Sequence, residues 1–283
     1  MSFNNYLYIA LIFAFSFGIF YTAESENKIL QKIEKKSKKH NWNSLDYSDL
    51  IVEVGEQFLG VPYVGGTLDK DKVETCTVIL DKLDCVTYFE TTLAISSLIS
   101  SEIELNMSNI YDEVEYTRYR DGTLDGYESR LHYTSDWIID NISKGIVSDI
   151  TKSLGGEELD INVYFMSENP DKYKRLKDNP KLVDEISKIE DRVNENEFYY
   201  VPKENVADIE SKLQSGDIVA IVTTIPGLDY GHIGLINKKD GEARFMHASL
   251  TKKKVIIDKT ISEYVSGISK FTGITVLRPL KPE

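Results

Sequence analysis

The sequence predicts an α+β fold, in which N-terminal helices pack against a C-terminal antiparallel sheet. Apolar residues between positions 47 and 101 recur at helical spacing, whereas from Ser215 onward short apolar runs alternate with polar breaks. The chain has 283 residues, 41% of them hydrophobic, enough for one large globular domain or two small ones. Its net charge of -13 argues against nucleic acid or an anionic membrane surface as a main partner.

The first element is an uncharged apolar run at residues 6–23. It predicts that residues 1–23 are a secretory signal peptide or an uncleaved membrane anchor, and either implies export to the periplasm or cell envelope. Cleavage stays open, because no Lys or Arg precedes the run and Tyr21 stands where a small residue is expected before Ala23. Contact with a membrane is expected only through residues 6–23, and only if they are uncleaved.

Residues 24–46 are a charged, lysine-rich connector, and a single catalytic domain is expected at 47–283. Its first helix is predicted by four apolar residues at helical spacing and is ended by a glycine and a proline. These residues are Leu50, Ile51, Val54 and Phe58, followed by Gly60 and Pro62.

A second helix is predicted to begin at Cys85, directly after Asp84, with Val86, Phe89 and Leu93 on its apolar face. Residues 102–210 mix helical pieces with polar loops and are interpreted as a large insertion between this helix and the sheet. The sheet itself is predicted from runs at 217–223, 232–236, 243–248, 254–258 and 274–277.

Cys85 is the first candidate for chemistry. A helix N-terminus presents free N–H groups and a positive dipole end, which favour the thiolate form of a cysteine. The alternatives are a buried structural thiol and a disulfide with Cys76, which would silence the nucleophile. Dependence of activity on a reducing agent tests the disulfide.

His232 and His247 flank a predicted hairpin. If residues 238–241 form its loop, the two histidines face one another directly on one side of the sheet. A slip of one residue would put them on opposite faces. One imidazole would then take the thiol proton, and the second imidazole would hold the first one in the right tautomer. His232, close to two glycines, is assigned as the base.

The order of five motifs resembles the NlpC/P60 superfamily of papain-like cysteine peptidases that act on peptidoglycan. They are 60–66 (GVPYVGG), Asp84-Cys85, 215–219 (SGDIV), 231–234 (GHIG) and His247-Ala248. The fuller pattern, across residues 47–280, is similar to the N-acetylmuramoyl-L-alanine amidase-like proteins of the DUF1460 family. It adds 118–120 (RYR), 129–137 (SRLHYTSDW), 165–167 (FMS), 227–229 (GLD) and Arg278-Pro279.

The resemblance implies a papain-like fold with Cys85 as nucleophile, His232 as base and His247 as the orienting residue. It implies that Tyr63 assists the oxyanion or the substrate. Many NlpC/P60 endopeptidases have a serine directly after the cysteine, where this chain has Val86. That departure weakens the case for cleavage of the usual D-glutamyl–diamino-acid bond.

The segment Ser129–Trp137 has two interpretations, both based on a helix. It packs on the core with Arg130 in a structural ion pair, or it forms a cleft wall that binds substrate. The candidate substrate residues are Arg130, His132, Tyr133, Asp136 and Trp137. The 118–120 run has the same two interpretations, with the structural one ahead.

The sequence thus predicts an exported cysteine hydrolase of peptidoglycan or muropeptides, without a cofactor or metal. The favoured bond joins the lactyl group of muramic acid to L-alanine. A stem-peptide endopeptidase is the rival within this class. The alternatives of another class are a zinc amidase using His132, His232, His247 and Cys85, and a non-catalytic wall-binding module.

Overall fold

The computed structural model describes residue 26 and residues 28–69 and 73–282. The predicted signal peptide or anchor at residues 1–23 lies outside this part of the chain. Within the described residues, no helix is both long enough and apolar enough to cross a bilayer.

An antiparallel sheet forms the centre of the molecule. Its strand order is β2-β3-β8-β4-β5-β6-β7, and β1 also pairs with β8. The strands are β1 (Val147–Asp149), β2 (Glu157–Leu159), β3 (Phe198–Pro202), β4 (Ile218–Thr223), β5 (Tyr230–Lys239), β6 (Glu242–Ser249), β7 (Lys254–Thr260) and β8 (Phe271–Pro279). The five C-terminal strands confirm the predicted sheet, and the α+β class is confirmed with them.

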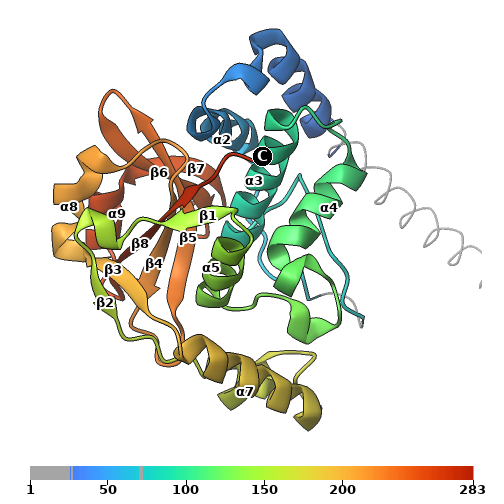
Figure 1. The fold of residues 1–283 in the computed structure, drawn as a ribbon, viewed down its shortest axis with the longest axis vertical. Coiled ribbons are helices and arrows are strands. Elements are labelled where there is room, and N and C mark those ends of the chain that lie inside the picture. The colour runs from blue at the N-terminus through green and yellow to red at the C-terminus, as the bar shows by residue number, and fades with distance from the viewer. Residues whose placement is uncertain (1–25, 27, 70–72, 283) are drawn as a thin grey trace, which may run out of the picture.

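Helices cover both faces of the sheet, with α2 to α5 on one face and α8 and α9 on the other (Figure 1). Alternate residues of β4 enter the two cores: Ile218, Ala220 and Val222 lie on the first face, and Val219 and Ile221 on the second. The helices are α2 (Tyr47–Gly55), α3 (Cys85–Ser100), α4 (Met107–Arg118), α5 (Thr134–Ser143), α6 (Phe165–Glu168), α7 (Pro180–Asn194), α8 (Val206–Ile209) and α9 (Ile261–Ser266).

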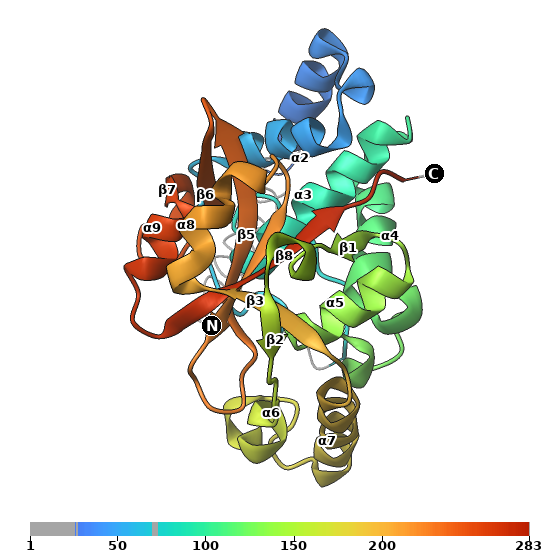
Figure 2. The same cartoon turned by 60° about the vertical axis from the view of Figure 1, so that its left-hand side comes forward.

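Residues 102–210, predicted as an insertion between the cysteine helix and the sheet, also contribute strands to the sheet. β1 and β3 both come from this region and pair with β8, so the region completes the main sheet. Its α6 and α7 lie together at one end of the molecule (Figure 2), over a third core that includes Tyr133, Met166 and Val193.

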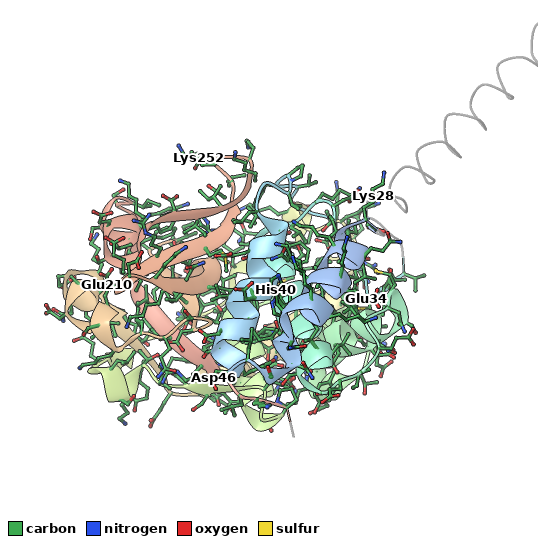
Figure 3. All side chains as sticks on the ribbon, turned by 90° about the horizontal axis from the view of Figure 1, so that it is seen from above. Lys28, Glu34, His40, Asp46, Glu210 and Lys252 are labelled. Carbon is green, nitrogen blue, oxygen red and sulfur yellow. The ribbon has the colours of Figure 1, made fainter. Side chains whose placement is uncertain are left out.

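Packing begins earlier than the predicted start near Tyr47. Residues 28–40 are helical, and they bury Leu30 and Ile33 in the same core as α3. Trp42, which follows this helix, is 2% exposed. Figure 3 shows the helix carrying Lys28 and Glu34 on the outside of the molecule, beside α2. The predicted connector is therefore partly a structural helix with a lysine-rich outer face.

The hairpin of β5 and β6 turns more tightly than predicted. Asp240 and Gly241 have φ values of 53° and 85°, as a two-residue turn of type I′ requires. Arg244 consequently pairs with Asn237, two residues beyond the predicted partner Leu235. Because side chains alternate with a period of two, this shift keeps the predicted face of each residue.

Candidate active site

The N-terminus of α3 is fixed by a capping box. The Asp84 carboxylate accepts a hydrogen bond from the Thr87 N–H at 2.9 Å, and the Thr87 hydroxyl accepts one from the Asp84 N–H at 2.9 Å. These reciprocal bonds satisfy two N–H groups that a helix start leaves unpaired. They also set Cys85 as the first residue of the helix, as the sequence predicted.

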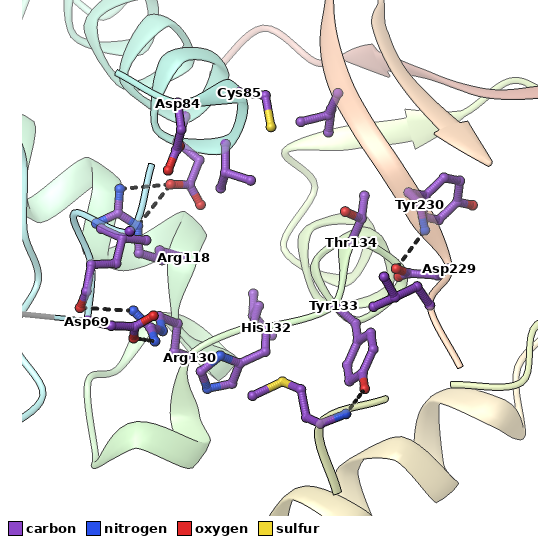
Figure 4. A pocket seen from close by; sticks show the side chains of 18 of the residues that line it. Asp69, Asp84, Cys85, Arg118, Arg130, His132, Tyr133, Thr134, Asp229 and Tyr230 are labelled. Atoms are coloured by element: carbon purple, nitrogen blue, oxygen red, sulfur yellow. Dashed lines mark hydrogen bonds and ion pairs between the residues drawn. The ribbon is translucent and has the colours of Figure 1, made fainter. Parts of the chain in front are cut away.

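Cys85 lies at a cavity of about 330 Å³ between α3, β5 and the loop that precedes α5. His232 and its neighbours Gly231 and Ile233 line the same cavity. Figure 4 shows Cys85 at one end of this pocket, with Arg130 and His132 on the wall away from it. The thiol and one of the two predicted imidazoles therefore share one cavity.

His232 and His247 are joined by a short hydrogen bond. Nε2 of His232 lies 2.6 Å from Nδ1 of His247. Because the hairpin register differs from the predicted one, the two residues meet diagonally across β5 and β6. Their rings lie among aromatic rings: the His247 ring stacks on Phe245 at 4.6 Å and meets Tyr264 edge-on at 5.0 Å.

This aromatic packing keeps both imidazoles neutral. Burial, followed by the neighbouring His247 and Lys270, lowers the pKa of His232 to about 3. Burial also lowers the pKa of His247 to about 4, although Asp258 raises it in part. At neutral pH each ring therefore has one N–H donor and one acceptor nitrogen.

Burial and, to a smaller extent, the Asp84 carboxylate together raise the pKa of the Cys85 thiol to about 12. The backbone N–H groups of Ile233, Cys85 and Val86 lower this pKa, as expected at a helix N-terminus. Their effect is smaller than that of burial. The resting sulfur carries its proton.

Tyr63 lies beside the nucleophile, as the sequence predicted. It bridges to Leu83, just before the capping box. Its phenol has a pKa raised to about 12 by burial and by the nearby Cys85 and Asp84. The hydroxyl is therefore a protonated donor at physiological pH.

The prediction of one helix over Ser129–Trp137 is wrong. Residues 130–133 are extended, and α5 begins only at Thr134. The buried Arg130 side chain forms an ion pair with the exposed Asp69 at 2.5 Å and lies 3.5 Å from the buried Glu74. Its charge is thus already balanced, and the structural interpretation of this residue holds, although it does line the cavity.

His132 and Tyr133 also line the cavity. His132 has Nε2 2.8 Å from the Tyr127 carbonyl oxygen, so this nitrogen is the donor and Nδ1 the acceptor. The Tyr133 hydroxyl donates to Glu190 at 2.6 Å and accepts from the Met166 N–H. Its polar end is therefore committed to the protein.

Asp136 and Trp137 lie away from the cavity. Asp136 accepts two hydrogen bonds from Arg120, at 2.9 and 2.7 Å. Trp137 packs edge-on against Phe89 at 5.0 Å in the main core. Neither side chain lines the cavity.

The two cysteines are both free thiols, so the considered disulfide is not formed. The sulfur of Cys76 faces the Tyr111 carbonyl oxygen on α4 at 3.9 Å. Among the described residues, no three His, Cys, Asp or Glu side chains gather at metal-binding spacing. The ligand set that the zinc alternative requires is therefore not assembled in that part of the chain.

Comparison with known proteins identifies the family. Residues 53–274 match the family model described as "AmiA-like: N-acetylmuramoyl-L-alanine amidase-like". The chain belongs to this amidase-like family. A comparison with curated proteins found no match. The family supports a hydrolytic, cell-wall amidase-like role.

Solved structures resemble this amidase-like protein closely. A structure titled N-acetylmuramoyl-L-alanine amidase, from Bacteroides uniformis, is 36% identical over 83% of this chain and 99% of that chain, with a TM-score of 0.78. One titled putative xylanase, from Bacteroides fragilis, is 35% identical over 80% and 99%, with a TM-score of 0.75. Protein LPG0564 of Legionella pneumophila, titled with DUF1460, is 22% identical over 92% and 98%, with a TM-score of 0.67, and shows the shared fold.

The amidase-like chain has one candidate residue that the sequence reasoning missed. Asp258 on β7 places Oδ2 3.5 Å from Nε2 of His247, a buried atom with no hydrogen bond of its own. His247 pairs with Ile256, so Asp258 is its diagonal neighbour on the next strand. Finding it required the register of β6 and β7, which contains an irregularity.

Stability of the amidase-like protein is predicted to fall in acid because of its buried imidazoles. Burial, followed by Arg130, holds the pKa of His132 well below 6.5, whereas unfolding returns it to about that value. The unfolded state then binds more protons, so stability is complete above pH 6.5 and is lost as the pH falls. For His132 alone the loss at about pH 5 is up to about 2 kcal/mol.

Urea unfolding of the wild type and of His132→Gln, each at about pH 7.5 and about pH 5, measures this difference. The wild type is expected to lose more stability on acidification than the variant. Comparing the two changes removes the contribution of the carboxyl groups, which both proteins share. Equal losses in the two proteins would contradict the assignment of a neutral, buried His132.

Proposed function

We propose that this chain is a cysteine-dependent N-acetylmuramoyl-L-alanine amidase with a papain-like, NlpC/P60-type site. One observation carries the proposal: Cys85 lines the same cavity as His232, and Nε2 of His232 is hydrogen-bonded to Nδ1 of His247. A thiol next to an oriented imidazole is the arrangement that nucleophilic catalysis uses. The amidase-like family supports an amide as the bond that is cut.

The tautomers of this site follow from Asp258. A carboxylate can only accept, so His247 carries its proton on Nε2, toward Asp258, and accepts at Nδ1. His232 then donates from Nε2 across the 2.6 Å contact, and its Nδ1 keeps a free lone pair. In this assignment Nδ1 of His232 is the base that receives the thiol proton. Asp258 is a positioning residue, because it acts through His247.

The reaction begins with the sulfur of Cys85 attacking the carbonyl carbon while its proton moves to Nδ1 of His232. The negative oxygen of the tetrahedral intermediate is stabilised by N–H groups at the start of α3 and by the Tyr63 hydroxyl. The C–N bond breaks, and the leaving amine of L-alanine takes the proton from His232. A thioester then links Cys85 to the lactyl carbonyl.

Water resolves the thioester. His232 takes a proton from the attacking water, the oxygen bonds to the carbonyl carbon, and the C–S bond breaks with return of the proton to Cys85. The products are a free lactyl carboxylate and a peptide with a free amine. Because the resting thiol and imidazole are both neutral, proton transfer accompanies attack and does not precede it.

We place this reaction outside the cytoplasm, in the periplasm or cell envelope, on the basis of the apolar run at residues 6–23. The substrate is peptidoglycan or a muropeptide derived from it. Val86, the residue after the nucleophile, lines the cavity and replaces the serine of many endopeptidases with an apolar side chain. This favours the amidase over the stem-peptide endopeptidase.

A glycosidase reaction of the kind named for the Bacteroides fragilis protein has less support here. It requires two carboxyl groups that flank the scissile bond. The carboxylates that line this cavity are committed elsewhere: Asp84 to Thr87, Glu90 to Arg118, Asp69 to Arg130, and Asp229 to the N–H and hydroxyl groups of Ser135. Among the described residues of the lining, no pair of carboxyl groups is therefore left to flank a glycosidic bond.

Cys85→Ala is expected to abolish hydrolysis of a defined muropeptide, because Cys85 is the only thiol among the described residues that line the cavity with His232. Mass spectrometry of the products of the wild type should show an intact stem peptide beginning with L-alanine and a peptide-free muramic acid. Cys76→Ala, the matched control, should keep wild-type activity. Products cut inside the stem peptide would show that the protein is an endopeptidase. Unchanged substrate with both the wild type and Cys85→Ala would contradict hydrolysis of this substrate.

Asp258→Ala is expected to lower kcat by at least about tenfold with little change in KM, because the tautomer of His247 is no longer fixed. Asp258 raises the pKa of His247, so its removal should also move the acid limb of the activity profile to lower pH. Asp258→Glu should restore part of kcat. Asp240→Asn, at the exposed hairpin turn, is the control; a loss in Asp258→Ala without a shifted acid limb would mean a purely structural role.

A further inference from the structure

The helix of residues 28–40 presents a stripe of lysines to solvent. Lys28, Lys32, Lys35 and Lys39 recur at spacings of four and three residues, and Lys36 lies one turn beyond Lys32. All five side chains are exposed, and they lie together with His40 on the outer face of this helix. Figure 3 shows the labelled Lys28 on this side of the molecule.

This stripe is opposite in sign to the rest of the protein. Residues 28–40 contain six lysines and one glutamate, a net charge of +5. The whole chain, including this helix, carries -13, so the remaining residues carry -18. Lys38, off the stripe, pairs with Glu34 at 2.6 Å, and within the stripe the Lys32 ammonium donates to the Gln57 carbonyl oxygen at 3.4 Å. Net charge alone hides this local positive face.

The stripe is held rigidly. Leu30 and Ile33, on the inner side of the same helix, are 8% and 0% exposed and belong to the main core. The lysines repel one another: the pKa of Lys32 is lowered by partial burial and then by the charge of Lys36. An anionic surface would relieve this repulsion, and a fixed helix would meet it without a further cost of ordering the backbone.

The position of the stripe in the sequence points to the partner. The uncharged apolar run at 6–23 ends a few residues before Lys28. Clusters of lysines on one face of an amphipathic helix bind anionic lipid headgroups. We propose that the lysine face of residues 28–40 docks on an anionic phospholipid bilayer and holds the catalytic domain against it. The proposal does not depend on the chemistry of Cys85.

A bilayer fits this face better than a groove-binding partner does. The stripe runs along the outside of one helix, so it offers a line of charges to a flat surface and no walls to enclose a chain. Over residues 28–39 it is about 17 Å long at the rise of an α-helix. Phosphates of several lipids lie within that distance, and electrostatic attraction adds to insertion of an apolar segment.

Flotation of the full chain with vesicles tests the proposal. Vesicles of phosphatidylcholine are compared with vesicles containing about 30% phosphatidylglycerol, each at low salt and at about 0.5 M NaCl. The wild type is expected to bind the anionic vesicles at least about tenfold more strongly, with the preference lost at high salt. The comparison between vesicles cancels any uncharged contribution of residues 6–23.

The test variant is Lys32→Gln, Lys35→Gln, Lys36→Gln and Lys39→Gln combined. The control removes the same charge at four other exposed lysines: Lys177, Lys181, Lys252 and Lys254. Loss of the anionic preference in the first variant alone would support the proposal. The proposal would be overturned if the wild type and the test variant preferred anionic vesicles equally, or if the control variant lost the preference to the same extent. It would also be overturned if the wild type bound to a heparin column but showed no preference between the two kinds of vesicle.

Discussion

The hydrogen bond between the His232 and His247 imidazoles is the interaction on which the rest of the site depends. At 2.6 Å, it joins the half-buried His232 at the cavity to His247 in the interior, where the rings of Phe245 and Tyr264 pack against it. A buried polar group without a partner is costly, so each ring fixes the other. The same burial keeps both rings neutral, which leaves one nitrogen of His232 available as a base. Asp258 sets the direction of this short chain of donors and acceptors.

The fold brings the thiol to this pair from a distant part of the sequence. The capping box at Asp84 fixes where α3 starts, and the first core holds that helix against β5. Charged side chains around the cavity neutralise one another, as Glu90 and Arg118 do at 2.8 Å. What remains at the cavity is a neutral thiol, a neutral imidazole and backbone N–H groups. Such a site suits attack on an uncharged amide whose oxygen becomes negative only in the transition state.

Much of this arrangement could be predicted from local patterns. Asp84 before Cys85 indicated a capped helix, and period-two alternation gave the strands and the common face of both histidines, even though the hairpin register was displaced. Long-range contacts could not be predicted in this way. Arg130 lies in an extended segment and forms an ion pair with Asp69, which lies far back in the chain. Strand β1 has only three residues, too few to show a pattern. Leu30 and Ile33 are buried in the core, but their neighbours in the sequence are mostly lysines and other polar residues. Each of these depends on a partner that no local pattern identifies.

The central claim is that the thiol of Cys85 and the imidazole of His232 meet in one cavity. Alkylation by iodoacetamide at neutral pH, followed by mass mapping of the two cysteine-containing peptides, tests it directly, with Cys76 as an internal reference. The account predicts that Cys85 reacts faster than Cys76, and that His232→Ala slows Cys85 while leaving Cys76 unchanged, because the base is lost. Equal rates at Cys85 in the wild type and His232→Ala would contradict it.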